Sequence, residues 1–264
     1  MRLSRRSALA QAGVALATAG ASACRTRAST FEPPRNMVDL THTLSPEFPF
    51  LPVEGKTFPF RSSPIATIKG DGVYANRWEL TEHVGTHLDA PCHFAEGAMA
   101  IEAIPLETLF VPLAVVSIAE RVATNPDTTL GAGDLMRWEK DHGEIPARAA
   151  VFLHTGWDVR TKEPGAFVNM DGAKTMRFPG FSDKAIEFLL GRRSISGIGI
   201  DTLSIDPGRD KEYAVHKELF RAGKWAVECV ANLSRVPATG AFVFVAPVKV
   251  AGASGAPARI VAVW

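Results

Sequence analysis

The sequence has few cysteines and almost no net charge. Three cysteines in 264 residues cannot form a framework of paired disulfides. One bridge between Cys92 and Cys229 is conceivable in an oxidising compartment, although two small buried thiols are the commoner arrangement. Lysine and arginine number 29 against 28 acidic residues. No basic stripe with interleaved aromatic residues is present, so nucleic acid is not an expected partner.

Long apolar runs and dividing segments are also missing. No stretch of the sequence is long and apolar enough for a membrane span, and no internal repeat or polar linker divides the 264 residues. With 46% hydrophobic and 22% charged residues, the composition is ordinary and by itself indicates no function. We therefore expect a single domain with one substantial core over residues 37–264.

Acidic residues are absent from the first 23 positions, whereas Arg2, Arg5 and Arg6 lie there. The arginines precede an alanine- and glycine-rich stretch that ends at residue 23, which is typical of a cleaved signal peptide. Residues 4–9 resemble a twin-arginine export signal and predict export to the periplasm. Cleavage before Cys24 would leave a soluble form or a lipid anchor on that cysteine, with residues 24–36 as a flexible lead. The alternative is an amphipathic N-terminal arm or a misassigned start codon.

What the sequence does contain is a concentration of histidine. Three of its seven histidines and one aspartate fall within eleven positions of the segment His83-Val-Gly-Thr-His-Leu-Asp-Ala-Pro-Cys-His-Phe94. If this segment is extended, alternate side chains share a face. One face then carries His83, His87 and Asp89, with Gly85 leaving room between them, and the other carries Val84, Thr86 and Leu88.

The two faces differ in chemistry, since the first suits a divalent cation and the second suits packing against a core. A helix would also bring His83 and His87 together, but Gly85 and Pro91 disfavour a helix here. Four ligand-type residues at this density predict a metal site. Mixed nitrogen and oxygen donors suit zinc or manganese without deciding between them.

Hydrophobic periodicity predicts an α/β fold in which strands outnumber helices. Five prolines between positions 46 and 64 predict an ordered loop over residues 45–64, as an arm over a pocket or a subunit contact. Helices are expected at residues 182–190, where Ser182 is a suitable N-cap, and at residues 215–222. Strands are expected at residues 77–81, leading into the histidine-rich segment, and at 113–118, 149–154, 194–200, 226–233, 241–248 and 258–263.

Two distant residues are further candidates for metal ligands. His216 lies at the start of a predicted helix, and Glu228 lies inside the apolar segment 225–231. A buried carboxylate there is costly unless it is paired or bound to a cation. From this stretch alone, Glu228 could equally be an edge-strand residue that faces water.

Other polar residues carry a weaker signal. Asp201, Ser204 and Asp206 could line a pocket, although such residues at strand ends are more often turn-forming. Trp157 could be a pocket wall or part of the core. The remaining histidines are expected to be structural or exposed; they are His42, His142 and His154.

The pattern H-x-G-T-H-x-D-A-P-x-H-F over residues 83–94 resembles the cyclase family of metal-dependent hydrolases, which includes bacterial kynurenine formamidases and isatin hydrolases. The similarity continues through landmarks that follow the family's order. These are Val38–His42 with Leu44–Pro46, Thr155–Trp157, Phe178–Gly180, Gly199–Asp206, His216, Glu228 and Asn232–Leu233. Because they span roughly residues 37 to 262, the resemblance covers nearly the whole predicted domain.

The resemblance implies a single α/β domain with the swivelling β/β/α arrangement and a mixed sheet, assembled as a homo-oligomer. It also implies two divalent ions per subunit. The implied ligands are His83, His87 and Asp89 for one ion, His216 for the second, and Asp89 and Glu228 as bridges. His93 matches the catalytic acid/base of the family.

Such a set predicts metal-assisted hydrolysis of a small amide, lactam or lactone. The family pattern uses a metal-bound hydroxide, with His93 moving the proton. No serine in a G-x-S-x-G turn competes for the role of nucleophile. A metal-dependent cyclase or dehydratase could have the same site. A non-catalytic metal-binding protein is the third alternative, against which the presence of His93 argues.

In one position the chain departs from the kynurenine formamidases. Their loop after the first strand carries a tryptophan, whereas the segment 48–52 places Leu51 there. Leucine has no π-face, and an aromatic pair contributes about 0.5–1.5 kcal/mol beyond simple burial. We therefore predict that N-formylkynurenine is at best a secondary substrate and that a differently shaped cyclic or aromatic amide, or a lactone, is preferred.

Overall fold

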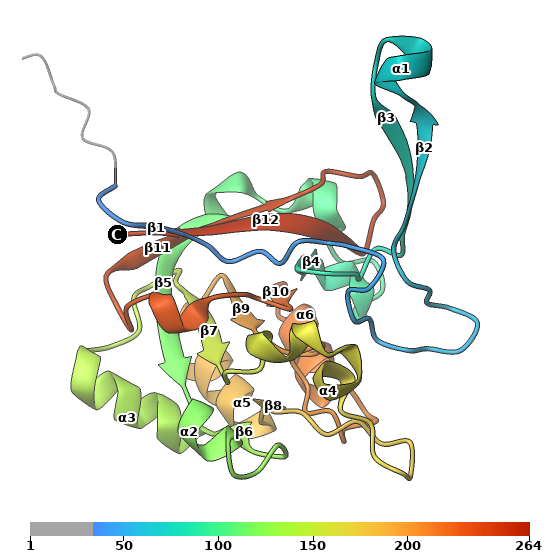
Figure 1. Cartoon of the computed structure of the whole chain (residues 1–264). Coiled ribbons are helices and arrows are strands. Elements are labelled where there is room, and N and C mark those ends of the chain that lie inside the picture. Colours follow the sequence, from blue (N-terminus) through green and yellow to red (C-terminus); the bar gives the residue numbers. More distant parts are fainter. Residues whose placement is uncertain (1–33) are drawn as a thin grey trace, which may run out of the picture. The chain divides into compact units, whose positions relative to one another are not determined.

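A closed ring of strands is the frame of the molecule. In the computed structural model, which describes residues 34–264, the main sheet has eight strands in the order β1-β12-β11-β5-β7-β9-β10-β4 (Figure 1). Strand β4 pairs with β10 on one side and also with β12 on the other. Seven strands therefore close on themselves, and β1 is attached to β12 outside the ring.

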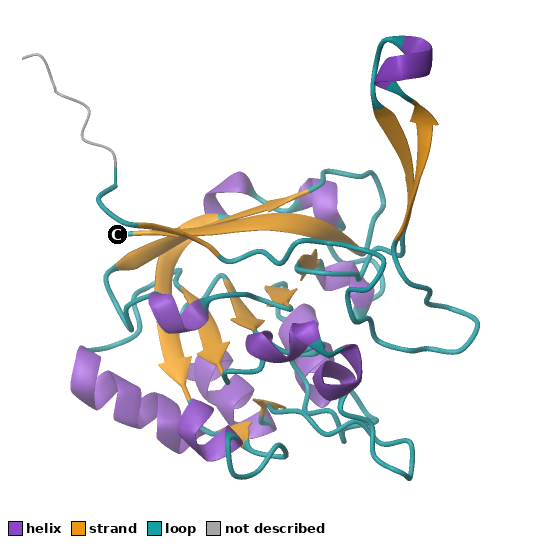
Figure 2. Cartoon of the chain, in the orientation of Figure 1, coloured by secondary structure: helices purple, strands orange, loops and turns teal. Residues whose placement is uncertain are grey.

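The described part of the chain has twelve strands, six α-helices and five short 3₁₀ turns (Figure 2). The strands are β1 Met37–Asp39, β2 Arg61–Ala66, β3 Ala75–Glu79, β4 His87–Asp89, β5 Phe110–Ser117, β6 Thr129–Leu130, β7 Ala150–His154, β8 Gly180–Phe181, β9 Gly197–Ile200, β10 Trp225–Glu228, β11 Ala241–Pro247 and β12 Gly255–Val263. The α-helices are α1 Ile68–Asp71, α2 Ala119–Val122, α3 Ala132–His142, α4 Pro164–Val168, α5 Asp183–Arg192 and α6 Ala214–Arg221. The 3₁₀ turns are η1 Pro91–His93, η2 Ile101–Ala103, η3 Leu106–Thr108, η4 Asp158–Lys162 and η5 Leu233–Arg235.

The sheet is mixed because the strands of one half are parallel and those of the other half pair antiparallel. Strands β5, β7, β9 and β10 are parallel, whereas β1, β11, β12 and β4 join by antiparallel pairing. Strands β7, β9 and β10 are short and almost wholly buried, as expected for strands covered on both faces. Helices α3, α5 and α6 contribute Leu135, Ile186 and Leu219 to the core on one face. This mixed, single-domain α/β architecture confirms the predicted fold class.

The second face of the sheet surrounds a separate apolar cluster inside the ring. Phe152 from β7, Val243 from β11 and Ile260 from β12 are fully buried there. Glycines in β9 let aromatic rings pack directly against the backbone. A Cβ atom at Gly199 would lie only 2.7 Å from the Phe152 ring and would therefore prevent this packing. The ring of strands is therefore filled by side chains, as small closed sheets are.

Most predicted elements are confirmed, with displaced ends. Ser182 caps α5 by accepting a hydrogen bond from the backbone N–H of Ala185 at 3.2 Å. Strand β10 ends at Glu228 and not at residue 233, so that expected end is wrong. The physical reason is the next residue, Cys229, which has a left-handed φ of 53° and turns the chain out of the strand.

Two expectations for the segment before the histidine-rich motif need correction. Residues 61–64 of the expected loop belong to β2, in which Pro64 is tolerated because the strand lies at an edge. The strand expected at residues 77–81 is β3, which is displaced to Ala75–Glu79 and is not part of the main sheet. It pairs only with β2, and Figure 1 shows this two-stranded arm, capped by α1, projecting from the body.

The projecting arm is unusually apolar for an exposed element. Five of its large hydrophobic side chains are more than half exposed: Ile65, Ile68, Val73, Tyr74 and Trp78. Within residues 34–264, no helix has the length and apolar character that crossing a membrane requires. The predicted signal peptide, its cleavage before Cys24 and the predicted lead up to residue 33 lie outside the described residues and stay predictions.

Candidate metal centre

The closing strand places two site residues opposite each other. In the antiparallel pair β4–β10, His87 is the direct partner of Glu228, and Asp89 is the partner of Ala226. Cross-strand partners have neighbouring side chains on one face, and residues two apart on a strand share that face. His87, Asp89 and Glu228 therefore converge on one side of the sheet, where each is 5% exposed or less.

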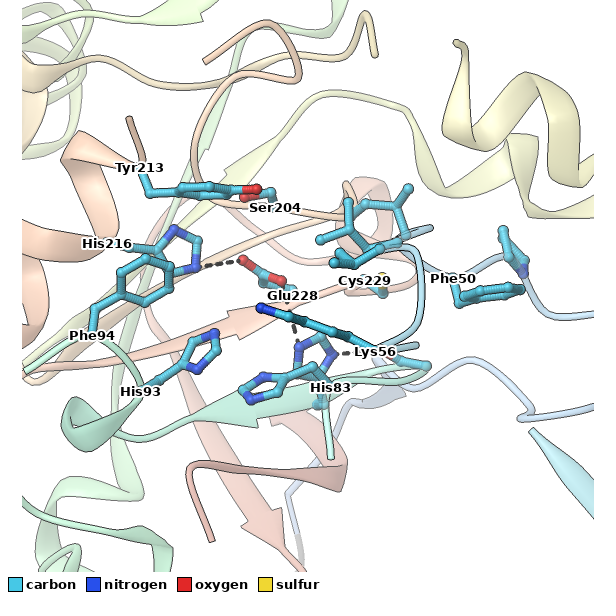
Figure 3. Close-up of a pocket in the computed structure, with 16 residues that line it drawn as sticks. Phe50, Lys56, His83, His93, Phe94, Ser204, Tyr213, His216, Glu228 and Cys229 are labelled. Carbon is cyan, nitrogen blue, oxygen red and sulfur yellow. Dashed lines mark hydrogen bonds and ion pairs between the residues drawn. The ribbon is translucent and has the colours of Figure 1, made fainter. Parts of the chain in front are cut away.

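A fourth side chain reaches the same point from α6. The Nε2 atom of His216 lies 3.2 Å from Glu228 Oε1 (Figure 3). It also lies 3.5 Å from Asp89 Oδ2. The Nε2 atom of His87 lies 3.1 Å from Asp89 Oδ1 and 3.5 Å from Glu228 Oε2. Two imidazoles and two carboxylates thus form a buried cluster, which we call the His87 cluster.

Hydrogen bonds outside the cluster fix which ring nitrogen faces it. His87 Nδ1 donates to the carbonyl of Gly85 at 2.8 Å, and His216 Nδ1 is bonded to the carboxylate of Asp206. Asp206 also accepts the backbone N–H of Val215 at 2.8 Å, which holds the first turn of α6. Both Nε2 atoms are left free to bind a cation, which is how a protein orients histidine ligands.

His83 and His93 stand side by side next to this cluster. Their rings stack with centroids 3.9 Å apart. His83 Nδ1 lies 2.6 Å from Asp89 Oδ1, and its Nε2 lies 3.0 Å from the Ser254 hydroxyl. Gly255 makes room for the ring, since a Cβ there would be 2.4 Å from His83 Cε1. All six residues expected at the site are therefore brought together.

The histidine-rich segment is not extended throughout, so that part of the prediction is wrong. Only residues 87–89 form a strand, because Gly85 has a left-handed φ of 67° and bends the chain before it. The core-facing set is buried as expected, but His87 and Asp89 of the polar set are buried just as deeply. Val84, Thr86 and Leu88 are 3% exposed or less, and the Thr86 hydroxyl donates to the Cys229 carbonyl at 2.6 Å.

Electrostatics explain how charges are tolerated at this depth. Burial alone would lower the pKa of His87, yet the carboxylates of Asp89 and Glu228 raise it to about 10. Burial raises the pKa of Asp89, but His83 and His87 outweigh it and hold that pKa well below its usual value. In the absence of a cation, protonated imidazoles therefore neutralise the carboxylates, and a bound cation would replace those protons.

The donor atoms fit a divalent cation. Within residues 34–264, His87 Nε2 and Asp89 Oδ2 are buried without a hydrogen-bond partner. Buried polar atoms are rarely left unpaired, so these two indicate a missing ligand. Two sets of three donor residues share Asp89, and within each set the donor atoms lie within 4.8 Å of one another. The first set is His83, Asp89 and His93, and the second is His87, Asp89 and Glu228.

A cavity of about 290 Å³ opens above the cluster. Its floor includes His83, His87, His93, His216 and Glu228, and its walls are largely apolar (Figure 3). Phe94 and Tyr213 form one wall, while the loop over residues 49–56 forms the other. The expectation that the proline-rich loop lies over a pocket is therefore confirmed for this part of it.

The residues with a weaker sequence signal either line the cavity or stabilise the structure around it. Ser204 lines the cavity, whereas Trp157 is fully buried in the core. Asp201 accepts hydrogen bonds from the backbone N–H groups of Thr155 and Gly156 and therefore forms the turn there. Asp206 holds His216, a role that its position at a strand end did not reveal.

Sequence reasoning missed two residues of the cavity, Lys56 and Tyr213. Tyr213 has a left-handed φ of 53° immediately before α6, and a tyrosine three residues before a candidate ligand was a usable signal. The two described cysteines are unbonded, and the expectation of two buried thiols holds only for Cys229. Cys229 is buried beside the cavity, and Cys92 is partly exposed.

Comparisons with known proteins agree with this geometry. The family model described as "Putative cyclase" matches residues 38–207. The chain belongs to the cyclase family. It is 33% identical to the isatin hydrolase of Roseibium aggregatum, over 86% of this chain and 90% of that protein. It is 28% identical to the kynurenine formamidase of Paracidovorax citrulli, over 86% and 96% of the two chains.

Solved structures of cyclase-family proteins share the fold. Isatin hydrolase A of Labrenzia aggregata, solved with benzyl benzoate bound, matches with a TM-score of 0.82 at 34% identity, over 86% of this chain and 93% of that one. A protein of Bacillus stearothermophilus described as a predicted metal-dependent hydrolase matches with a TM-score of 0.64 at 26% identity, over 86% and 97%. The buried His87 cluster is the feature of this chain that suits a metal.

The cluster predicts which substitutions remove metal. We expect His87→Ala, Asp89→Ala and Glu228→Ala to lose bound metal after dialysis, because each leaves a buried charge or ring without its partners. The same is expected for His83→Ala and His216→Ala. Asp206→Asn should retain metal with about 10- to 100-fold weaker affinity, since it only orients a ligand. Elemental analysis of the dialysed proteins measures this.

His93→Ala is the matched control, and it should keep its metal. Loss of metal from His93→Ala as complete as from His87→Ala would contradict the distinction between ligands and the acid/base. Affinity should also rise with pH, because the raised pKa of His87 means that a cation must displace a proton. The expected slope is about tenfold per pH unit for each proton displaced, measured by metal titration at two pH values.

Proposed function

We propose that this protein is a metal-dependent hydrolase that cleaves a small amide, lactam or lactone. The observation that carries the proposal is the position of His93, which lines the cavity directly beside a buried cluster suited to a cation. The names of its relatives support the choice of bond, because isatin hydrolase and kynurenine formamidase are both amide-hydrolysing enzymes by name.

His93 is suited to move a proton. Burial lowers its pKa to about 4, although the carboxylate of Asp89 acts in the opposite direction. At neutral pH the ring is therefore uncharged and has a free nitrogen that can take up a proton. Because its pKa lies below the working pH, His93 is a weak base whose protonated form readily delivers the proton to a leaving nitrogen or oxygen. Stacking on His83 keeps the ring at the edge of the cavity. When bound, a divalent cation would polarise the substrate carbonyl and lower the pKa of water.

The side chains of the cavity walls can bind the substrate and exclude water from it. Phe94 lies 4.8 Å from His216 between ring centroids and, with Tyr213, offers a flat apolar surface for a small ring. Ser204 adds a hydroxyl that can hydrogen-bond a substrate oxygen. These residues favour a compact cyclic or aromatic substrate.

The proposal includes two divalent ions of zinc or manganese in each subunit. The number follows the family resemblance, and the five proposed ligands His83, His87, Asp89, His216 and Glu228 gather in one site to supply the donors. Donors limited to nitrogen and oxygen support the type of ion. We further propose that N-formylkynurenine is a secondary substrate. Leu51 lines the cavity, and no tryptophan does so within the described residues.

The proposed reaction is tested with a panel of isatin, formyl-arylamines, N-formylkynurenine and lactones. Hydrolysis of isatin or a lactone gives one product with the mass of the substrate plus one water, and hydrolysis of a formyl-arylamine gives an amine and formate whose masses together equal the same sum. Cyclisation or dehydration instead removes one water. We expect gain of water, and we expect His93→Ala to lower kcat by about 10²- to 10⁴-fold because a general acid/base contributes that much. Loss of water would replace the hydrolase assignment with the cyclase alternative, and the highest kcat/KM for N-formylkynurenine would restore the formamidase assignment.

We also propose a homo-oligomer held through the projecting arm. The support is the apolar surface of the arm defined above, since contiguous exposed apolar side chains mark interaction sites. The arm side chains Ile65 and Trp78 are 66% and 67% exposed. We propose that a second copy of the chain covers these exposed side chains of the arm.

The double variant Ile65→Glu with Trp78→Glu should reduce the mass in solution to that of one chain, because charges placed in an apolar interface are costly to bury. Light scattering after size exclusion measures the mass. Val159→Glu is the control, since Val159 is 68% exposed but lies in η4, away from the arm. An unchanged mass for the double variant would exclude the arm as the contact.

A further inference from the structure

The cavity carries one positive side chain that the proposed chemistry does not use. Among the residues that line it, Lys56 is the only lysine or arginine. Figure 3 shows its side chain reaching over the cavity, with the nitrogen toward the histidine and glutamate side chains. Within residues 34–264, Lys56 forms no ion pair, whereas Lys184 and Lys217 do.

The backbone around Lys56 is built as a defined turn. The N–H groups of Lys56 and Thr57 both donate to the carbonyl of Val53 at 3.0 Å, and Gly55 supplies the left-handed φ of 71° that such a turn needs. The Thr57 hydroxyl then closes the loop. It donates to the Leu51 carbonyl at 2.8 Å and accepts the Val53 N–H at 2.8 Å. These bonds hold Lys56 at the cavity mouth.

The side chains around Lys56 favour an anionic ligand at its ammonium group. Phe50, Leu51 and Val53 from the same loop, and Leu203, are apolar, and the hydroxyls of Ser204 and Tyr213 also line the cavity. A neutral polar group gains an ordinary hydrogen bond in such a cavity, whereas a carboxylate beside Lys56 gains a charge-assisted one, which is about twice as strong. When the His87 cluster holds divalent cations, a carboxylate in the cavity is attracted from both sides.

We propose that Lys56 selects substrates that carry a carboxylate in addition to the bond that is cleaved. This inference rests on the proposed hydrolase function and narrows its substrate class to small anionic amides or lactams. The volume of about 290 Å³ matches one ring with short substituents. Lys56 is thereby a specificity residue, and the cleavage itself depends on His93 and the cluster.

A matched pair of substrates tests the proposal. 2-Formamidobenzoate and formanilide share the formamide and the ring, and only the first carries a carboxylate. We expect Lys56→Met to raise KM for 2-formamidobenzoate about two- to fivefold, because the Lys56 side chain is exposed and an exposed charge pair contributes up to about 1 kcal/mol. KM for formanilide and kcat for both should change less than about twofold, since a carboxylate contact affects binding more than chemistry.

Two variants complete the kinetic test. Lys56→Arg keeps the charge and should retain most of the preference, while Lys140→Met removes an exposed lysine of α3 far from the cavity lining and should change neither substrate. Added salt should reduce the preference of the wild type, because exposed charges are screened. Equal effects of Lys56→Met on both substrates, or no effect on either, would overturn the proposal.

A binding measurement separates this inference from the proposed function. Calorimetry with 2-aminobenzoate and aniline, the products of the matched pair, reports recognition without turnover. Lys56→Met should weaken only 2-aminobenzoate. If the wild type hydrolyses no member of the panel, the hydrolase function fails, and unchanged binding of 2-aminobenzoate by Lys56→Met would then overturn the Lys56 assignment as well.

Discussion

The pairing of β4 with β10 is the constraint on which the site depends. It sets His87 opposite Glu228 and carries Asp89 to the same face, so two carboxylates are buried side by side. Such a pair is unfavourable in a protein interior unless positive charge lies between its members. Strand β4 also pairs with β12, which places Gly255 beside Asp89 and leaves space for the His83 ring. The strand that closes the ring is thus the strand that builds the site.

In this site the residues that neutralise charge are buried more deeply than His93, the residue proposed to transfer a proton. The His87 cluster is buried among β4, β10 and α6, and its imidazoles have raised pKa values because carboxylates surround them. His93 lies nearer the cavity, where burial without an equivalent carboxylate contact lowers its pKa to about 4. Histidines a few residues apart in one segment therefore differ in protonation at neutral pH. This difference, rather than histidine density, supports separate roles for ligand and acid/base.

Much of this arrangement could be predicted from the sequence, and the limits have physical causes. The alternation of Val84, Thr86 and Leu88 with His83, His87 and Asp89 predicted correctly that the second set of side chains meets at the site, because side-chain direction is local. The same pattern could not reveal the bend at Gly85, since glycine allows both signs of φ. His216 and Glu228 joined the site only through the family resemblance, because pairing between strands distant in sequence leaves no local pattern.

Other elements were mispredicted because their partners are not encoded nearby. The strand expected at residues 77–81 exists as β3, but nothing in the sequence indicated that it pairs only with β2 in a projecting arm. Asp206 looked like a turn residue, and only the fold shows its bond to His216. Lys56 gave no signal, because its relation to the cavity arises from the turn around Gly55 and the Thr57 hydroxyl.

The central claim is that the buried His87 cluster binds divalent metal through nitrogen and oxygen donors alone. Anomalous diffraction from crystals of the metal-loaded protein tests it most directly. The account predicts anomalous peaks at about 2.0–2.2 Å from His87 Nε2, His216 Nε2 and the carboxylates of Asp89 and Glu228. A fully loaded crystal with no peak in this cluster, or with its strongest peak on the Cys229 thiolate, would contradict it.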